Sequence, residues 1–208
     1  MARAPRKRRA YHHGDLRRAL IDATLALVEE RGPENTTVRD AAKRAGVSPG
    51  APFRHFPSRK ALFTAVAEEA MRRLREEVAA ALAAEPAAQP LARLRAMGSG
   101  YLRWAAGNPT HFRIISSREL IDFDGSAALR GDNDALRALM VEILEAARKA
   151  GEIKARDIEL TALLARATSY GLARMLVDGQ FPSWGVPERA AQRTMAAALD
   201  LFVDSLRK

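Results

Sequence analysis

Apolar residues recur along this chain at intervals of three and four, which is the spacing of one face of an α-helix. The first series ends at Gly32-Pro33 and consists of Leu16, Ala19, Leu20, Ala23, Leu27 and Val28. No segment shows the sustained alternation of apolar and polar residues that is typical of a β-strand. The pattern therefore predicts an all-α protein.

Residues 37–46 carry the signals of one short helix and of the turn after it. Thr37 is a suitable N-cap for a helix over residues 38–45, and Asp40 stands in the capping-box position three residues on. Gly46 is suited to end this helix, because glycine readily takes the left-handed conformation of a tight turn between helices. The segment predicts a short helix followed by a tight turn.

A second short helix is predicted directly after this turn, with Ser48 as its N-cap. Pro52 removes the first regular backbone hydrogen bond of that helix, so we expect a tightened or irregular opening turn. The helix ends at Pro57, and Ser58 is the N-cap of a long helix that runs to about residue 84. No linker rich in Gly, Ser or Pro precedes residue 85, so we expect this long helix to be continuous.

The rest of the chain predicts five further helices, which brings the expected total to about nine. Segments rich in proline, glycine and aspartate separate them. Their approximate ranges are 91–107, 109–118, 132–150, 156–179 and 187–207.

Positive charge is concentrated in the first part of the chain. The net charge of +9 divides into 14 Lys and Arg against 6 Asp and Glu in residues 1–60, and 20 against 19 in residues 61–208. This asymmetry indicates a polyanionic partner for the first segment, since each cation that meets a phosphate releases a condensed counterion. A solvated tail that keeps the protein soluble is the alternative explanation of the charge.

Several functional classes lack their usual residues in this sequence. There is no cysteine, and no Gly-x-Ser-x-Gly, P-loop or dinucleotide-binding motif, so we expect neither an enzyme nor a cofactor. An acid/base enzyme that uses scattered carboxylates stays open. His12 and His13 have no further ligands nearby, so no metal site is predicted. No run of about 18 apolar residues occurs, so we expect a cytoplasmic protein without a membrane partner.

Two segments of the first part, TTVRDAA at residues 36–42 and AGVSPGAPFRHFPSRKALF at residues 45–63, resemble the DNA-binding domain of the TetR family. YHHGDLR at residues 11–17 resembles the opening of one branch of that family. YLRWAAGNPTHFR at 101–113 and YGLARMLVDG at 170–179 are similar to the regulatory domain of the same branch.

The resemblance implies a helix-turn-helix domain at residues 13–60, whose second helix lies in the major groove of double-stranded DNA. Three residues are candidates for contact with base edges, namely Gly50, Ala51 and Arg54. The other predicted DNA-binding residues, most of them at positions that usually contact the phosphate backbone, are Thr37, Ser48, Phe53, His55, Ser58, Arg59 and Lys60. The family most often has Tyr where this chain has Phe53, so the usual hydroxyl-to-phosphate bond is absent.

A basic arm at residues 1–12 precedes this domain and holds the cations from Arg3 to Arg9. Arms of this kind follow the groove or the phosphates beyond the motif in other helix-turn-helix proteins. The alternative is a disordered tail in the free protein.

The resemblance also implies that residues 61–208 form a helical regulatory and dimerisation domain. In the family the last two long helices usually pair with their copies in a second subunit, and here they lie at about 157–179 and 187–207. Their apolar residues include Leu160, Leu163, Leu164, Ala167, Gly171, Met175, Met195, Leu199, Phe202, Val203 and Leu206. In the alternative interpretation these faces pack only within one chain.

A pocket for a small-molecule effector of unknown identity is implied in the same domain. The candidates for its wall are Tyr101, Trp104, Phe112, Phe123, Met140, Tyr170, Arg174 and Trp184. Each of the aromatic residues and Met140, taken alone, is more often part of a core than of a pocket.

Together these features predict a TetR-type transcriptional regulator, a repressor that binds a palindromic operator as a homodimer, associates with the nucleoid when bound, and is released by a small molecule. The alternative is an architectural protein that binds DNA without sequence specificity. That alternative explains the charge, but it does not explain the ordered motif or the large neutral second domain.

Overall fold

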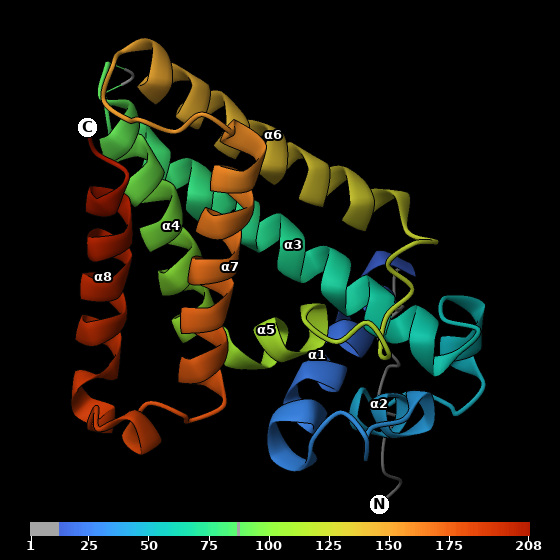
Figure 1. Cartoon of the computed structure of the whole chain (residues 1–208). Helices are drawn as coiled ribbons and strands as arrows, with labels where there is room; N and C mark the ends of the chain where they lie inside the picture. The colour runs from blue at the N-terminus through green and yellow to red at the C-terminus, as the bar shows by residue number, and fades with distance from the viewer. Residues whose placement is uncertain (1–12, 87) are drawn as a thin grey trace, which may run out of the picture. The chain divides into compact units, whose positions relative to one another are not determined.

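The computed structural model describes residues 13–86 and 88–208, and the regular elements of these residues are helices joined by short loops (Figure 1). The β-structure within these residues is one isolated bridge, between Ile153 and Arg207. The prediction of an all-α protein is therefore confirmed, and the described part of the chain has eight α-helices and two 3₁₀ turns. The elements are α1 (His13–Arg31), α2 (Val38–Arg44), η1 (Ala51–Arg54), α3 (Arg59–Ala83), α4 (Pro90–Gly107), α5 (Pro109–Ile115), α6 (Ala127–Lys149), α7 (Ile158–Val177), η2 (Pro182–Trp184) and α8 (Glu188–Ser205).

The chain divides into two compact units, residues 1–66 and residues 67–208. The division falls inside α3, so this helix contributes its first turns to unit 1 and the remainder to unit 2. The sequence placed the boundary at residues 60 and 61, which also lie in α3. No helix in the described ranges is long and apolar enough to cross a membrane.

In unit 1, α1, α2 and η1 pack against one another, and the start of α2 is closed by the predicted capping box. The Thr37 hydroxyl accepts a hydrogen bond from the Asp40 backbone N–H at 3.2 Å, and the Asp40 carboxylate accepts one from the Thr37 N–H at 3.1 Å. Gly46 has a φ of 70°, as the tight turn requires. The N–H of Val47 then binds the Ala42 carbonyl at 3.0 Å, which satisfies one of the free carbonyls at the end of α2.

The second short helix is shorter than predicted, because η1 is a single 3₁₀ turn of four residues. The predicted tight opening extends through the whole element. Pro52 has no N–H to donate, and its carbonyl accepts the N–H groups of both His55 and Phe56, at 2.9 and 2.8 Å. Pro52 and Phe56 are buried, so they fix the turn to the body of unit 1.

In unit 2, α4 packs against α5, α6, α7 and α8, and it lies between α7 and α8 in Figure 1. Two glycines permit this close packing. A Cβ atom added at Gly98 would lie 2.8 Å from the Leu199 side chain of α8, and one at Gly100 would lie 3.0 Å from the Ala81 Cβ atom of α3. The helices thus approach closely around α4, which buries Leu94, Leu102 and Ala105.

Two helix boundaries in unit 2 differ from the prediction. Helix α6 begins at Ala127 instead of about residue 132, because Ser126 caps it by accepting the Leu129 N–H at 3.2 Å. The polar run after Leu129 resembles a loop in sequence, but it forms a largely exposed stretch of helix. Helix α5 ends at Ile115, three residues before the predicted 118.

Candidate nucleic-acid interface and ligand cavity

The 3₁₀ turn η1 presents two predicted DNA-binding side chains to solvent. Phe53 is 43% exposed, and Arg54 is exposed and has no hydrogen bond or ion pair with any described residue. Gly50, just before the turn, has open space where a Cβ atom would stand. Ser48 and Gly50 are exposed, whereas Ala51 and His55 are half-buried. This segment therefore offers one unpaired guanidinium beside backbone that another molecule can approach closely.

Two cations of α2 that sequence reasoning missed are also exposed. Arg39 and Lys43 are separated by one helical turn, so they share a face, and neither is paired within the described residues. Their one-turn spacing was the sequence signal. Asp40 lies one turn before Lys43, but its carboxylate is engaged by Thr37 and Arg31. Lys60, at the start of α3, is likewise exposed and unpaired among the described residues.

Other cations of unit 1 are neutralised by carboxylates. Arg44 of α2 forms a two-pronged ion pair with Glu30 of α1, and this hydrogen bonding lowers the pKa of the Glu30 carboxyl. Arg31 lies 2.8 Å from the Asp40 carboxylate. The pKa of Asp40 is lowered first by the Thr37 hydroxyl and further by Arg31. These pairs leave Arg39, Lys43, Arg54 and Lys60 as the free cations of the described part of unit 1.

Arg59 has a structural position instead of a free one. Its guanidinium donates to the carbonyl oxygens of Thr36, at 2.9 Å, and Pro33, at 2.6 Å, and it lies 4.7 Å above the Phe63 ring. It therefore ties the start of α3 to the loop between α1 and α2. The nearby Ser58 hydroxyl caps α3 as predicted, because it accepts the Ala61 N–H at 3.1 Å. The basic arm from Arg3 to Arg9 lies outside the described residues.

Unit 2 contains a cavity of about 450 Å³ lined by α3, α4, α6, α7 and the segment after α5. Four of the predicted pocket residues line it, namely Tyr101, Phe123, Met140 and Tyr170. Phe112 is buried behind two of them, with its ring centroid 6.4 Å from that of Tyr101 and 5.8 Å from that of Tyr170. The structure therefore brings together at this cavity only some of the pocket residues predicted from the sequence.

The remaining three predicted pocket residues do not line this cavity. Trp104 is buried in the core and contributes no surface to the wall. Arg174 forms an ion pair with Asp178 one turn further along the chain, at 2.6 Å. Trp184 is 76% exposed, because η2 places it on the connection between α7 and α8. Aromatic character alone did not distinguish wall from core or surface.

Arg166 is a cavity residue that sequence reasoning missed. Its Nη1 atom donates a hydrogen bond to the Tyr101 hydroxyl at 2.8 Å, and its guanidinium carbon lies 5.2 Å from the centre of the Tyr101 ring and 5.1 Å from that of Tyr170. Burial raises the pKa of Tyr101, and the positive charge of Arg166 opposes that rise. The sequence signal for this residue was its position one helical turn before Tyr170, which places both side chains on one face of α7.

Four leucines of α7 and α8 are exposed, and one of them, Leu163, also lines the cavity of unit 2. Leu160, Leu163 and Leu164 are 53%, 63% and 51% exposed, and Leu201 of α8 is 73% exposed. Of the predicted α8 set, Met195, Leu199 and Val203 are buried within the chain, which corrects their assignment to an interface. Phe202 and Leu206 are half-buried.

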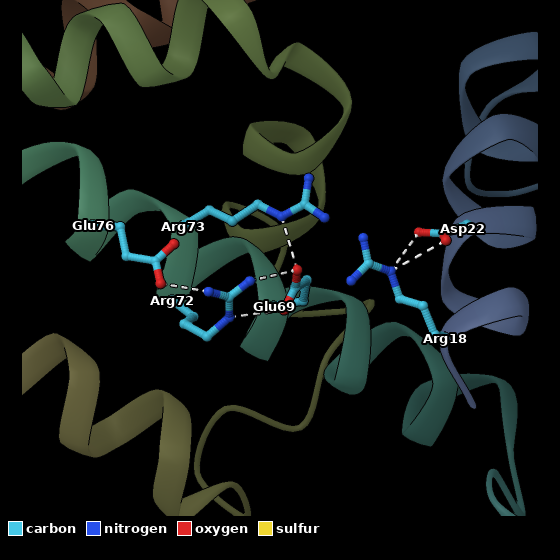
Figure 2. A network of polar contacts seen from close by, with 6 residues as sticks. All are labelled: Arg18, Asp22, Glu69, Arg72, Arg73 and Glu76. Carbon is cyan, nitrogen blue, oxygen red and sulfur yellow. Dashed lines mark hydrogen bonds and ion pairs between the residues drawn. The ribbon is translucent and has the colours of Figure 1, made fainter. Parts of the chain in front are cut away.

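A charged cluster lies on α3, just after the division between the units. Glu69 accepts hydrogen bonds from Arg72 at 2.8 Å and from Arg73 at 2.8 Å, and Arg72 also reaches Glu76 (Figure 2). The hydrogen bonds from Arg72 and Arg73 lower the pKa of Glu69 to about 2. The cluster stabilises this part of α3, since its pairs are three and four residues apart.

Sequence comparison gives matches to both units. Residues 20–66 match the family model described as bacterial regulatory proteins of the tetR family, and residues 94–202 match one described as a tetracyclin repressor-like C-terminal domain. The HTH-type transcriptional regulator BetI of Cronobacter sakazakii is 31% identical over 163 residues, which cover 78% of this chain and 76% of that protein.

Solved structures share the fold. A protein of unknown function from Rhodococcus sp. RHA1 has a TM-score of 0.79 and 29% identity, covering 97% of this chain and all of the other. A tetR-family regulatory protein from Rhodococcus RHA1 has a TM-score of 0.71 and 23% identity over 90% of this chain and 96% of its own. With two matching family models and a relative aligned over most of its length, this chain belongs to the TetR family of helix-turn-helix transcriptional regulators.

Proposed function

We propose that this regulator is a repressor that binds a palindromic operator as a homodimer and leaves it when a small molecule occupies the cavity of unit 2. The proposed binding to DNA rests on one observation, the set of unpaired, exposed cations on α2, η1 and the start of α3. Cations without an internal partner are available to phosphates and to guanine, and each phosphate contact releases a counterion.

Within this interface the side chains divide by chemistry. Arg54 reads a guanine through its O6 and N7 atoms, while Gly50 and Ala51 allow close approach and Ala51 meets a thymine methyl group. Arg39, Lys43 and Lys60 contact phosphates, together with the predicted backbone contacts of Thr37, Ser48, Phe53, His55 and Ser58. Arg59 is not included among these contacts, because its guanidinium is held by two carbonyl groups of unit 1.

Homodimer formation through α7 and α8 is supported by the exposed leucines of α7 together with Leu201. Complete burial of an exposed leucine contributes about 2 kcal/mol, so covering the half-exposed leucines of α7 contributes about 1 kcal/mol each and favours association. Gly171, also on α7, has open space at its Cβ position and permits a second helix to approach closely. A dimer places one DNA-binding unit on each half-site of a palindrome. The contacts of both units then contribute to affinity, whereas a single half-site provides only one set.

Release by a ligand is supported by the continuity of α3. This helix begins next to the DNA-contacting turn and later lines the cavity with Met71, Leu74 and Val78. A ligand that moves these residues changes the position of the same helix that carries Lys60, and a change of a few kcal/mol between two states is sufficient for regulation.

Selection of bound fragments from random or genomic DNA tests this proposal. The expected result is one enriched palindrome, bound by the protein as a dimer. Enrichment without any palindromic site would favour the alternative of an architectural DNA-binding protein.

A further inference from the structure

The charges around the cavity of unit 2 are predominantly positive. Its lining contains Arg118, Arg137 and Arg166 but a single acidic side chain, Glu159. Glu159 is already paired with Arg137 at 2.7 Å. The two remaining guanidinium groups have no carboxylate partner among the described residues.

Arg166 is exposed, and aromatic residues of the cavity hold its guanidinium in place. It is held by the Tyr101 hydroxyl and lies over the rings of Tyr101 and Tyr170. Arg118 likewise lies over a ring, that of Phe123, at 3.5 Å. A guanidinium offers five N–H donors, and the hydrogen bond to Tyr101 occupies one of them. The face of each ring that Arg166 covers is not available to a cationic ligand.

Two hydroxyl groups also line the cavity, those of Tyr101 and Ser169. The Tyr101 oxygen accepts a hydrogen bond from Arg166, so its own proton remains available to a further acceptor. Ser169 lines the cavity, is 6% exposed, and has no side-chain hydrogen bond with a described residue. Arg166, Tyr101 and Ser169 therefore each have a hydrogen-bond donor without an acceptor among the described residues.

The rest of the wall is apolar and adaptable. Met71, Met97 and Met140 line it together with Leu74, Leu136 and Phe123. Methionine side chains fit irregular apolar ligands because the thioether is polarisable and the chain is flexible. A volume of about 450 Å³ is within the usual range of small-molecule sites.

We propose that the effector is an amphipathic carboxylate, with its carboxylate bound by Arg166, Tyr101 and Ser169 and its apolar body against the methionines. The inference rests on the proposed function, in which this cavity is the effector site. It excludes cationic effectors, since Arg118 and Arg166 would repel them.

Three probes with the same body and different head groups test this chemistry, namely phenylbutanoate, phenylbutanol and phenylbutylammonium. Calorimetric titration of the full-length protein should show that the carboxylate binds at least about tenfold more tightly than the alcohol, and that the ammonium compound does not bind. Equal binding of the three, preference for the alcohol or the ammonium compound, or no binding of the carboxylate at millimolar concentration would overturn the inference.

Substitutions in the cavity test where the carboxylate head group of the ligand binds. Arg166→Gln should weaken carboxylate binding by about 10- to 100-fold and leave alcohol binding nearly unchanged, because only the charge-assisted hydrogen bonds are lost. Arg174→Gln is the matched control, since Arg174 lies on the same helix and does not line the cavity. Tyr101→Phe keeps the ring and should weaken carboxylate binding less than Arg166→Gln. An unchanged carboxylate affinity in Arg166→Gln contradicts the assignment.

Release of the operator is measured by fluorescence anisotropy of labelled DNA. This measurement distinguishes the proposed ligand chemistry from the proposed release of DNA by this cavity. If phenylbutanoate binds through Arg166 but the DNA stays bound, the ligand chemistry stands and release by this site is wrong. If release occurs with the alcohol as readily as with the carboxylate, the proposed function stands and the ligand chemistry is wrong.

Discussion

The guanidinium of Arg59 donates a hydrogen bond to the carbonyl oxygen of Pro33, with 2.6 Å between the nitrogen and the oxygen. The two residues are far apart in the chain, and the bond joins the first turn of α3 to the loop that follows α1. A cation at the edge of the DNA-contacting surface thus acts as a brace within the unit. Lys60, its neighbour in sequence, is exposed and unpaired among the described residues.

This contrast predicts that two adjacent substitutions affect stability differently. Arg59→Ala should lower the free energy of unfolding by about 1–3 kcal/mol, because it leaves two carbonyl groups without their donor. Lys60→Ala should change it by less than about 0.5 kcal/mol. Urea unfolding followed by circular dichroism measures both values. A stable Arg59→Ala protein would show that the brace is unimportant.

Arg54 and Lys60 should affect DNA binding differently. Arg54→Ala should cost about 1–3 kcal/mol and relax the preference at one base position, because a bidentate contact to guanine is lost. Lys60→Ala should weaken binding to all sequences and reduce the slope of log K against log salt by about 1, because one phosphate contact is lost. Competition binding with single-base operator variants checks both. An unaltered base preference in Arg54→Ala would exclude Arg54 as the base reader.

The unpaired cations of α2 should behave like Lys60. Lys43→Ala and Arg39→Ala should each reduce affinity and salt dependence without changing the preferred sequence. Arg44→Ala is a suitable control, because Arg44 is engaged by Glu30. If the control weakens DNA binding as much as Lys43→Ala, with its fold intact, the free cations of α2 have no special role.

The stability of the protein should depend on acid through Glu69. The pKa of this carboxyl falls from its ordinary value of 4.5 to about 2 in the folded protein, through its hydrogen bonds with Arg72 and Arg73. A lowered pKa means that the contribution to stability is fully present above pH 4.5 and is lost as the pH falls towards about 2. The difference in unfolding free energy between the wild type and Glu69→Gln should therefore shrink over this range. A constant difference would indicate that the ion pairs do not contribute.

The apolar face of α7 predicts the effect of a buried charge on assembly. Leu164→Glu should convert a dimer into a monomer, because an unpaired carboxylate cannot be buried at the interface without a large cost. Ala135→Glu is the control, at an exposed position of α6. Size-exclusion chromatography with light scattering gives the mass of each. A wild-type monomer at micromolar concentration would refute the proposed interface.

The sequence by itself determined several local features of the fold, although the N-cap predicted at Ser48 was wrong, because η1 begins after Gly50 and has no side-chain cap. Thr37, Ser58 and Gly46 lie where capping and turn chemistry place them, because each acts through backbone groups within a few residues. The same local signals carried the family resemblance. Pro52 indicated an irregular opening turn, but not that the whole element would be a single 3₁₀ turn.

The tertiary structure decided the partners and the exposure of side chains. Arg166 meets Tyr101 across 65 positions of the chain, and Arg59 meets Pro33 across 26, and no periodicity in the sequence relates such residues. Trp104 and Trp184 are the same residue type, yet one is 4% and the other 76% exposed. Helical spacing defines a face of a helix, whereas the packing of other helices decides whether that face becomes core, cavity wall or surface.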